Sequence, residues 1–88
     1  MEVIFSDSFN KDISKIRDKK LKGKILSVIE EIENAKSLSE IQNLGKLIGY
    51  KHHYRIRIGD YRFGIYNNNN QIEIARFLIR KEIYRYFP

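Results

Sequence analysis

Apolar residues follow two different spacings along this chain. In the first part they recur every three or four positions, and in the second part they alternate with polar residues. The first spacing places side chains on one side of a helix, and the second places them on one face of a strand. The pattern therefore predicts an α+β fold, with helices within residues 6–35 and strands from about residue 50 onward.

The helical part follows a short predicted strand at residues 2–6, which is rich in β-forming residues. The run Ser6–Ser8 offers side-chain oxygens that can cap a first helix extending to about Lys19. A second helical stripe extends over Leu21–Ala35. Because both helices have one apolar side, we expect a helical hairpin that packs on one face of a sheet.

The second part contains most of the predicted sheet. Its strands are Tyr50–Ile58, Tyr61–Tyr66 and Gln71–Leu78. The run Asn67–Asn70 predicts a hairpin loop, and Arg80–Pro88 predicts a short closing helix. The segment Lys36–Gly49 has room for a helical turn but shows no clear pattern. We expect a small antiparallel sheet of about four strands, with the helical hairpin on one face and a short C-terminal helix.

Composition limits the kind of protein. The 88 residues are enough for one domain, residues 1–88. Cysteine is absent and the two histidines are adjacent without a carboxylate cluster, so we expect no metal and no cofactor. The start lacks a signal-peptide pattern and no apolar run is long enough to cross a membrane, so a cytoplasmic location is expected.

Positive charge is concentrated in the second part. Residues 1–44 contain eight basic and eight acidic residues, whereas residues 45–88 contain nine and three. All of the net charge of +6 therefore lies in the half that carries most strands. This distribution indicates a polyanion such as RNA or DNA as a partner, although a basic sheet can also serve solubility alone.

Three arginines converge on one face of a predicted hairpin. Alternation of side chains places Arg55 and Arg57 on the same face of their strand. If Gly59–Asp60 forms a two-residue turn, Arg57 lies directly opposite Arg62 on the next strand. Like charges in that position destabilise a sheet by up to about 1 kcal/mol, so folding alone does not favour them. The arrangement indicates an anionic ligand.

RNA cleavage is one reaction that such a face can support. Attack of a 2′-OH on the adjacent phosphorus requires cations that stabilise the phosphorane, and arginine forks match phosphate oxygens. Arg55, Arg57 and Arg62 suit this role, and Arg80 lies just beyond the last predicted strand. Tyr84 follows Arg80 by one helical turn and can stack on a base or donate a proton.

Binding of single-stranded RNA without catalysis fits the same residues. Arginine clusters with aromatic side chains also describe plain RNA-binding proteins. In either case we expect further RNA contacts from basic residues near the arginines. These residues are Lys51, His53, Lys81 and Arg85.

Arg76 occupies an apolar position of the last predicted strand, in register with Ile72, Ile74 and Leu78. A charge in a core position requires a structural explanation. We expect a β-bulge, a salt bridge such as one to a helix carboxylate, or exposure at the end of the strand.

The motifs occur in an order that can be compared with known families. A short strand and a helical hairpin precede Leu47–Lys51 and Tyr54–Arg57, and the chain ends with the turn Gly59–Arg62, a last strand, and the pair Arg80 and Tyr84. Over essentially the whole chain this order resembles the RelE/ParE superfamily of bacterial toxin–antitoxin toxins. The turn and the final arginine–tyrosine pair are the most specific parts of the resemblance.

The resemblance implies a fold and an activity. The fold is a small antiparallel sheet with two N-terminal helices on one face. Members on the RelE side are ribosome-dependent mRNA endonucleases, which cleave codons in the ribosomal A site without metal and are inhibited by a cognate antitoxin. Members on the ParE side poison DNA gyrase instead.

The resemblance also implies which residues act. By position, Arg55 and Arg57 match two basic strand positions and Arg62 matches the hairpin arginine. Arg80 and Tyr84 match the C-terminal pair of RelE-type toxins. These five residues are therefore the expected catalytic residues.

The chain departs from the RelE pattern in the groups that move protons. RelE-type nucleases commonly have lysines where Arg55 and Arg57 stand, and position 79, often histidine in similar sequences, is Ile79. Arginine keeps its proton at neutral pH. The proton acceptor is therefore His53 or Tyr84, or the rate comes from orientation of the 2′-OH and stabilisation of charge.

We therefore expect a toxin that cleaves ribosome-bound mRNA by 2′-OH attack. A gyrase inhibitor of ParE type, in which the arginines form a docking surface, is one alternative, and a catalytically inactive toxin-like binding protein is another. The pair Arg80 and Tyr84 favours the nuclease, because a gyrase inhibitor does not need it.

Overall fold

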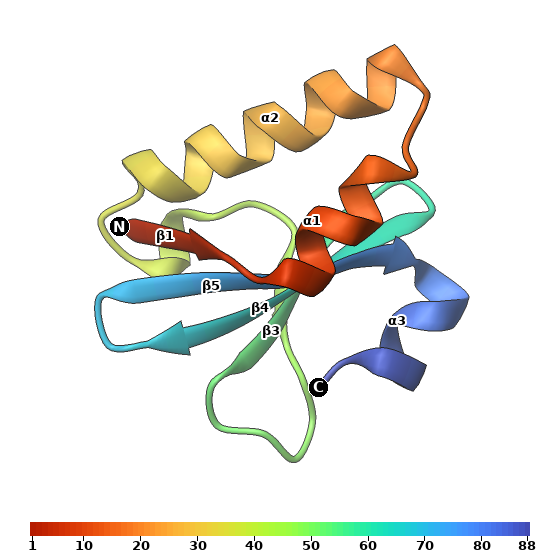
Figure 1. Ribbon diagram of the computed structural model, residues 1–88. Coiled ribbons are helices and arrows are strands. Elements are labelled where there is room, and N and C mark those ends of the chain that lie inside the picture. The colour runs from red at the N-terminus through yellow and green to blue at the C-terminus, as the bar shows by residue number, and fades with distance from the viewer.

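A computed structural model describes residues 1–88, and Figure 1 shows its helices and strands. The strands are β1 (Glu2–Phe5), β2 (Leu44–Lys46), β3 (His53–Ile58), β4 (Tyr61–Asn68) and β5 (Gln71–Ile79). The helices are α1 (Asp7–Ser14), α2 (Lys19–Asn34) and α3 (Arg80–Tyr86), with a 3-10 helical turn at Leu38–Glu40. None of the helices is long and apolar enough to span a membrane.

The strands form one sheet in the order β1-β5-β4-β3-β2. Neighbouring strands are antiparallel except β1 and β5, which are parallel. The predicted α+β class is confirmed, but the sheet has five strands instead of about four and includes one parallel pair. The additional strand, β2, is only three residues long and exists through its pairing with β3, so its own sequence carries almost no strand signal.

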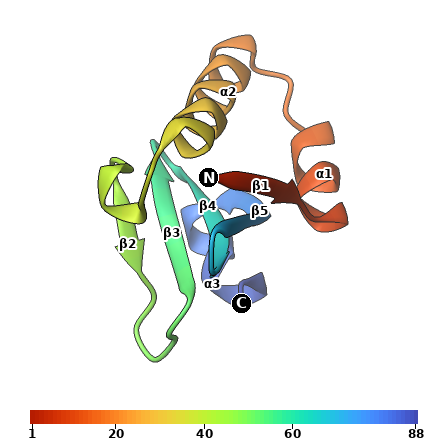
Figure 2. The same ribbon diagram turned by 90° about the vertical axis from the view of Figure 1, so that its left-hand side faces the viewer.

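The sheet separates two layers of apolar side chains. Helices α1 and α2 cover one face, as the sequence predicts, and α3 lies on the other (Figures 1 and 2). The main core lies under α1 and α2, and its fully buried residues include Ile32, Ile56, Phe63, Ile65, Ile74 and Phe77. A smaller cluster on the α3 face consists of Leu47, Ile83 and Phe87.

Helix α1 is shorter than the sequence predicts. It ends at Ser14 instead of extending to about Lys19. Asp18 has an extended backbone, and its side chain accepts hydrogen bonds from the backbone N–H groups of Lys20 and Leu21 at 2.9 and 3.3 Å. This cap starts a new helix at a position where the apolar spacing suggests a continuation of the first.

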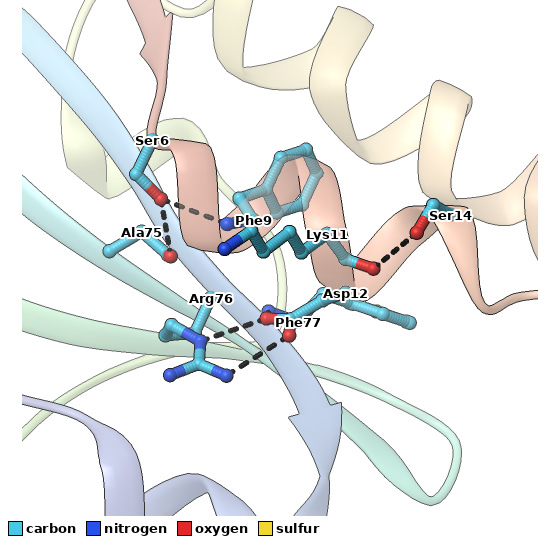
Figure 3. Close-up of polar contacts among 8 residues, drawn as sticks. All are labelled: Ser6, Phe9, Lys11, Asp12, Ser14, Ala75, Arg76 and Phe77. Atoms are coloured by element: carbon cyan, nitrogen blue, oxygen red, sulfur yellow. Dashed lines mark hydrogen bonds and ion pairs between the residues drawn. The ribbon is translucent and has the colours of Figure 1, made fainter.

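Two of the three expected explanations for the position of Arg76 apply, a β-bulge and a salt bridge. The register between β4 and β5 shifts so that Ala75 has no partner, and Phe77 returns to the buried core. The guanidinium of Arg76 donates two hydrogen bonds to the carboxylate of Asp12 on α1, at 2.9 and 3.0 Å (Figure 3). Asp12 also accepts the N–H of Phe77 at 2.9 Å, so the bulge and the salt bridge stabilise each other.

Ser6 fixes the start of α1 to the same strand. Its hydroxyl accepts a hydrogen bond from the N–H of Phe9 at 3.0 Å, as the predicted cap requires, and donates to the carbonyl of Ala75 at 2.6 Å (Figure 3). Helix α1 is therefore attached to β5 both by its cap and by Asp12.

Candidate functional site

The three arginines of the predicted hairpin lie on one face of the sheet. Arg57 and Arg62 are paired directly across β3 and β4, which confirms the pairing predicted from the turn at Gly59–Asp60. Arg55 lies two residues before Arg57 on β3 and so shares its face. This face points away from α1 and α2, because Ile56 between the two arginines is buried in the main core.

The turn between β3 and β4 positions a fourth arginine. Gly59 has a φ of +60°, a left-handed conformation that glycine adopts without strain. The carbonyl of Asp60 accepts a hydrogen bond from the N–H of Arg80 at 2.7 Å. Helix α3 therefore starts beside the turn, with Arg80 as its first residue.

Arg62 is held by the backbone of its own hairpin. Its Nη1 atom donates hydrogen bonds to the carbonyl oxygens of Gly59 and Tyr61, both at 2.8 Å. The side chain is partly buried. These contacts fix one edge of the guanidinium and keep its direction, so little reorganisation is needed when an anion binds.

The other four expected catalytic residues lie close enough to Arg62 to affect its charge. Partial burial lowers the pKa of the Arg62 guanidinium, neighbouring arginines lower it further, and a phenol acts in the opposite direction. In order of decreasing effect on this pKa, the neighbours are Arg57, Tyr84, Arg55 and Arg80. The structure therefore brings together all five side chains in one electrostatic environment.

No carboxylate neutralises this cluster. The ion pairs of the structure are Arg76 with Asp12 at 2.9 Å and Arg85 with Glu82 at 4.0 Å. Neither pair includes an arginine of the cluster. Because arginine keeps its proton at neutral pH, this face carries four unpaired positive charges and suits a polyanion.

Gly45 of β2 makes room for Arg55. The two residues are paired across β2 and β3, and a Cβ atom at residue 45 would overlap the Arg55 guanidinium. The Nη1 atom of Arg55 also donates to the carbonyl of Asn43 at 2.9 Å. Gly45 is not among the predicted site residues, although a glycine inside a strand often marks the close approach of another group.

A hollow of about 440 Å³ lies beside the cluster. Arg55 and Lys46 contribute cations to it, and Tyr50 and Tyr84 contribute aromatic rings that are 46% and 60% exposed. An exposed ring next to a cation can stack on an unpaired base while the cation holds a phosphate. Lys46 and Tyr50 are not among the predicted site residues: Lys46 lies in the segment without a clear pattern, and Tyr50 is expected only as the start of the strand that begins at His53.

Helix α3 presents Arg80, one of the four clustered arginines, and Tyr84 beside it. Ile83 and Phe87 bury the inner side of the helix, and the Phe87 ring packs so closely on Gly64 of β4 that a Cβ atom there would lie 2.6 Å from the ring. Arg80 and Tyr84, one helical turn apart, remain exposed. Packing of Phe87 thus sets the position of Tyr84 relative to β4.

The residues predicted to make further RNA contacts are placed differently from one another. Lys81 and Arg85 are exposed on α3. Lys51 is exposed too, but it lies in a loop and does not share a strand face with the arginines, because β3 begins at His53 and not at Tyr50. The backbone bends just before β3, so the extended conformation expected from the alternating residues does not include Lys51.

His53 lies outside the hollow that contains Arg55 and Tyr84. Its ring is 4.9 Å from that of Tyr66 and 5.7 Å from that of Phe87, between centroids, and its buried Nδ1 atom has no hydrogen-bond partner. His53 lines a second hollow, which Phe87 also borders. The structure contains no group of three or more His, Asp or Glu residues that could hold a metal ion.

Comparisons with known proteins agree over almost the whole chain. The family described as "ParE toxin of type II toxin-antitoxin system, parDE" matches residues 3–84. Toxin RelE3 from Methanocaldococcus jannaschii is 40% identical over 89 residues, which cover 100% of both chains. Both comparisons include every residue of the arginine cluster.

Solved structures show the same fold. A chain of the RelB–RelE antitoxin–toxin complex from Methanococcus jannaschii is 39% identical and matches with a TM-score of 0.81, over 97% of this chain and 99% of that chain. YafQ from E. coli is 17% identical, with a TM-score of 0.66 over 94% and 97% of the two chains, and resembles this protein in fold alone. On the family match and the 40% identical relative, this chain belongs to the RelE/ParE superfamily of type II toxin–antitoxin toxins.

Proposed function

We propose that this toxin is an endoribonuclease that cleaves mRNA on the ribosome. The observation that carries the proposal is a cluster of four arginines without a carboxylate partner, next to the exposed Tyr84. Such a cluster opposes folding but suits the negative charge that develops on a phosphorane. Likeness to Toxin RelE3 supports the same class of toxin.

Electrostatic stabilisation is the main contribution of the proposed site. The 2′-oxygen attacks the neighbouring phosphorus, and the bond from phosphorus to the 5′-oxygen breaks. Arg62 and Arg55, each held by backbone carbonyls, can donate to the non-bridging oxygens of the phosphorane with little reorganisation. Arg57 and Arg80 add positive charge around them.

Proton transfer is assigned to Tyr84 together with positioning of the substrate. The 2′-OH loses its proton to solvent water, because no side chain of the site accepts it, and the 5′-oxygen gains a proton. Arginine does not accept a proton at neutral pH, and His53 lines a separate hollow. Tyr84 shares a hollow with Arg55, where its phenol can donate to the leaving oxygen or its ring can stack on a base. Alignment of the 2′-OH with phosphorus supplies the remaining acceleration.

A cognate antitoxin is the proposed protein partner, and the cytoplasm is the proposed location. The related RelE of Methanococcus jannaschii occurs in a complex with the antitoxin RelB. We expect the antitoxin of this toxin to place acidic side chains on the arginine face or to displace α3. A small reading frame beside the toxin gene would encode it. Unchanged RNA binding by the purified toxin–antitoxin complex would contradict this arrangement.

Controlled expression with mapping of mRNA 5′ ends tests the nuclease. Native protein is compared with Arg62→Ala, Tyr84→Phe and Lys36→Gln, the last being a control at an exposed lysine outside the site. Cuts at a fixed position within codons that disappear only in the site variants support the proposal. If Tyr84→Phe still cuts, the ring acts by stacking, because this variant removes only the hydroxyl. Normal growth without cuts would identify an inactive binding protein.

A gyrase inhibitor is the second candidate function, because the matching family carries the ParE description. In this case the arginine face is a docking surface for a protein. Arg80 and Tyr84 then have no required role. This candidate predicts a DNA damage response and intact mRNA, so the same expression experiment separates the two functions.

A further inference from the structure

Helix α2 carries its charges in the order opposite to the one that its backbone favours. Its first six residues contain the lysines Lys19, Lys20, Lys22 and Lys24. Its last five residues contain the acids Glu30, Glu31 and Glu33. A helix has partial positive charge at its N-terminus and partial negative charge at its C-terminus, so both groups oppose the dipole. The stability of the helix therefore does not explain this order.

Lys20 and Lys24 add a second unfavourable feature. They are one helical turn apart, where like charges repel each other. Both side chains are exposed, and neither takes part in an ion pair. The backbone N–H groups at this end are already capped by Asp18, so the positive surface is made by the lysine side chains themselves.

The two lysines share a hollow with Arg57, one arginine of the cluster. The start of α2 lies beside the turn between β3 and β4, at the end of the sheet where α3 begins (Figure 1). The hollow measures about 640 Å³, and its polar lining consists of Lys20, Lys24, Ser27, Glu31, Gln42, Asn43 and Arg57. Glu31 accepts the N–H of Gln42 at 2.7 Å. Because Arg57 also faces Arg62, positive charge continues from this hollow to the arginine face.

We propose that the first half of α2, with Lys20 and Lys24, is a second surface that binds the phosphate backbone of RNA. We call it the α2 lysine surface; it rests on the proposed function only in taking RNA as the polyanion. It continues the positive surface of Arg55, Arg57 and Arg62 past the turn between β3 and β4, away from the phosphate that is cleaved. The RNA held there is either mRNA next to the cleaved codon or ribosomal RNA, since both present the same phosphodiester backbone.

RNA suits this surface better than a protein partner does. Lysine is depleted at protein interfaces, which depend on apolar and aromatic anchors. The apolar residues of the hollow, Val28 and Ile58, belong to the core. The exposed apolar residue of this half of α2, Leu26, lines a different hollow with Ile13 and Ile16. Other exposed apolar side chains, such as Phe5 and Ile48, lie on other parts of the chain.

Binding to ribosomes tests the α2 lysine surface. The ribosomes carry an mRNA whose reacting 2′-OH groups are replaced by hydrogen, so binding is measured without cleavage. The variant Lys20→Gln/Lys24→Gln is compared with Lys11→Gln/Lys36→Gln, which removes the same charge from exposed lysines outside the hollow. We expect about tenfold weaker binding than in the control. The slope of the logarithm of the association constant against the logarithm of the salt concentration should be shallower by about 1 to 2.

The outcomes separate this inference from the proposed function. Equal affinity and equal salt dependence of the two double variants would overturn it, and so would a loss confined to antitoxin binding. A loss seen also with free single-stranded RNA assigns the surface to mRNA, and a loss seen only with ribosomes assigns it to ribosomal RNA. An Arg62→Ala variant that still cuts mRNA would overturn the nuclease proposal, while the lysine comparison is decided by binding alone.

Discussion

Arg57 on β3 lies directly opposite Arg62 on β4, and no carboxylate neutralises either side chain. Opposed like charges destabilise a sheet. Burial and neighbouring arginines lower the pKa of Arg62, so its charged form is less favourable in the folded chain than in the unfolded chain. The fold thus loses stability to keep positive charge on one face, a trade-off typical of binding and catalytic sites.

Replacing Arg57 by glutamine should raise stability and lower cleavage. The change removes the charge opposite Arg62, so we expect a gain of up to about 0.5 kcal/mol, limited by solvent screening because Arg57 is exposed. If the toxin has the proposed nuclease activity, cleavage of ribosome-bound mRNA should fall about 10- to 100-fold, because one cation of the proposed site is lost. Urea unfolding and single-turnover cleavage measure the two effects. Lys36→Gln, as control, should change neither, and a loss of both stability and cleavage would contradict the trade-off.

Sodium chloride should stabilise the free toxin. Folding lowers the pKa of Arg62, so the charge of this side chain reduces stability at every pH below the folded pKa. This loss of stability disappears only as the pH rises through the folded pKa. Salt screens the repulsion from Arg57, Arg55 and Arg80 at neutral pH and leaves the larger contribution, that of burial, unchanged. We expect the Tm to rise by about 2–4 °C as the screening length falls from about 10 Å to about 3 Å. Arg57→Gln should show a smaller rise, and a constant or falling Tm in the native protein would contradict the unneutralised cluster.

The parts of the fold that sequence predicts correctly are fixed by local chemistry. The turn residues Gly59–Asp60 determine the register of β3 and β4, and this register alone places Arg57 opposite Arg62. Arg76 is similar, because a charge among apolar strand positions predicts a bulge, a salt bridge or exposure at the strand end, and the structure provides the first two. Such predictions depend on a few neighbouring residues only.

The features that sequence does not predict depend on distant segments. β2 exists because β3 pairs with it, and Gly45 acquires its role only when Arg55 lies across it. The parallel pairing of β1 with β5 joins the two ends of the chain. His53 follows the predicted alternation, yet its ring packs against Tyr66 and Phe87 and lines a neighbouring hollow instead of the one that contains Arg55 and Tyr84. Alternation gives the face of a side chain but not its neighbours.

Gly45→Ala should impair cleavage with little effect on stability. The added methyl group displaces the end of the flexible Arg55 side chain and its hydrogen bond to Asn43, so the change in unfolding free energy should stay below about 1 kcal/mol. Cleavage should fall about tenfold or more, because the guanidinium loses its fixed position. Gly23→Ala is the matched control: nothing lies within 4 Å of the added atom, and the helix should gain up to about 1 kcal/mol. Normal cleavage by Gly45→Ala would show that the position of Arg55 is unimportant.

Asp12→Ala should be the most destabilising of these changes. It leaves Arg76 and the N–H of Phe77 without their partner, and the carboxylate is almost fully buried, with 5% of the side chain exposed. We expect a loss of about 3 kcal/mol in urea unfolding. Folding raises the pKa of Arg76. The stability that this charged side chain contributes is therefore complete at pH values below the unfolded pKa and is lost only as the pH rises through the folded pKa. The contribution of Arg76 should be constant around neutral pH.

The same helix provides the control for this prediction. Asp7→Ala removes an exposed acid from the first turn of α1 and should reduce stability by less than about 1 kcal/mol. The double variant Asp12→Leu/Arg76→Met removes both charges and should recover part of the loss, since no unpaired charge is left in the structure. If Asp12→Ala and Asp7→Ala were equally stable, the salt bridge would not hold α1 on β5. The attachment of this helix would then depend on Ser6 and on apolar packing alone.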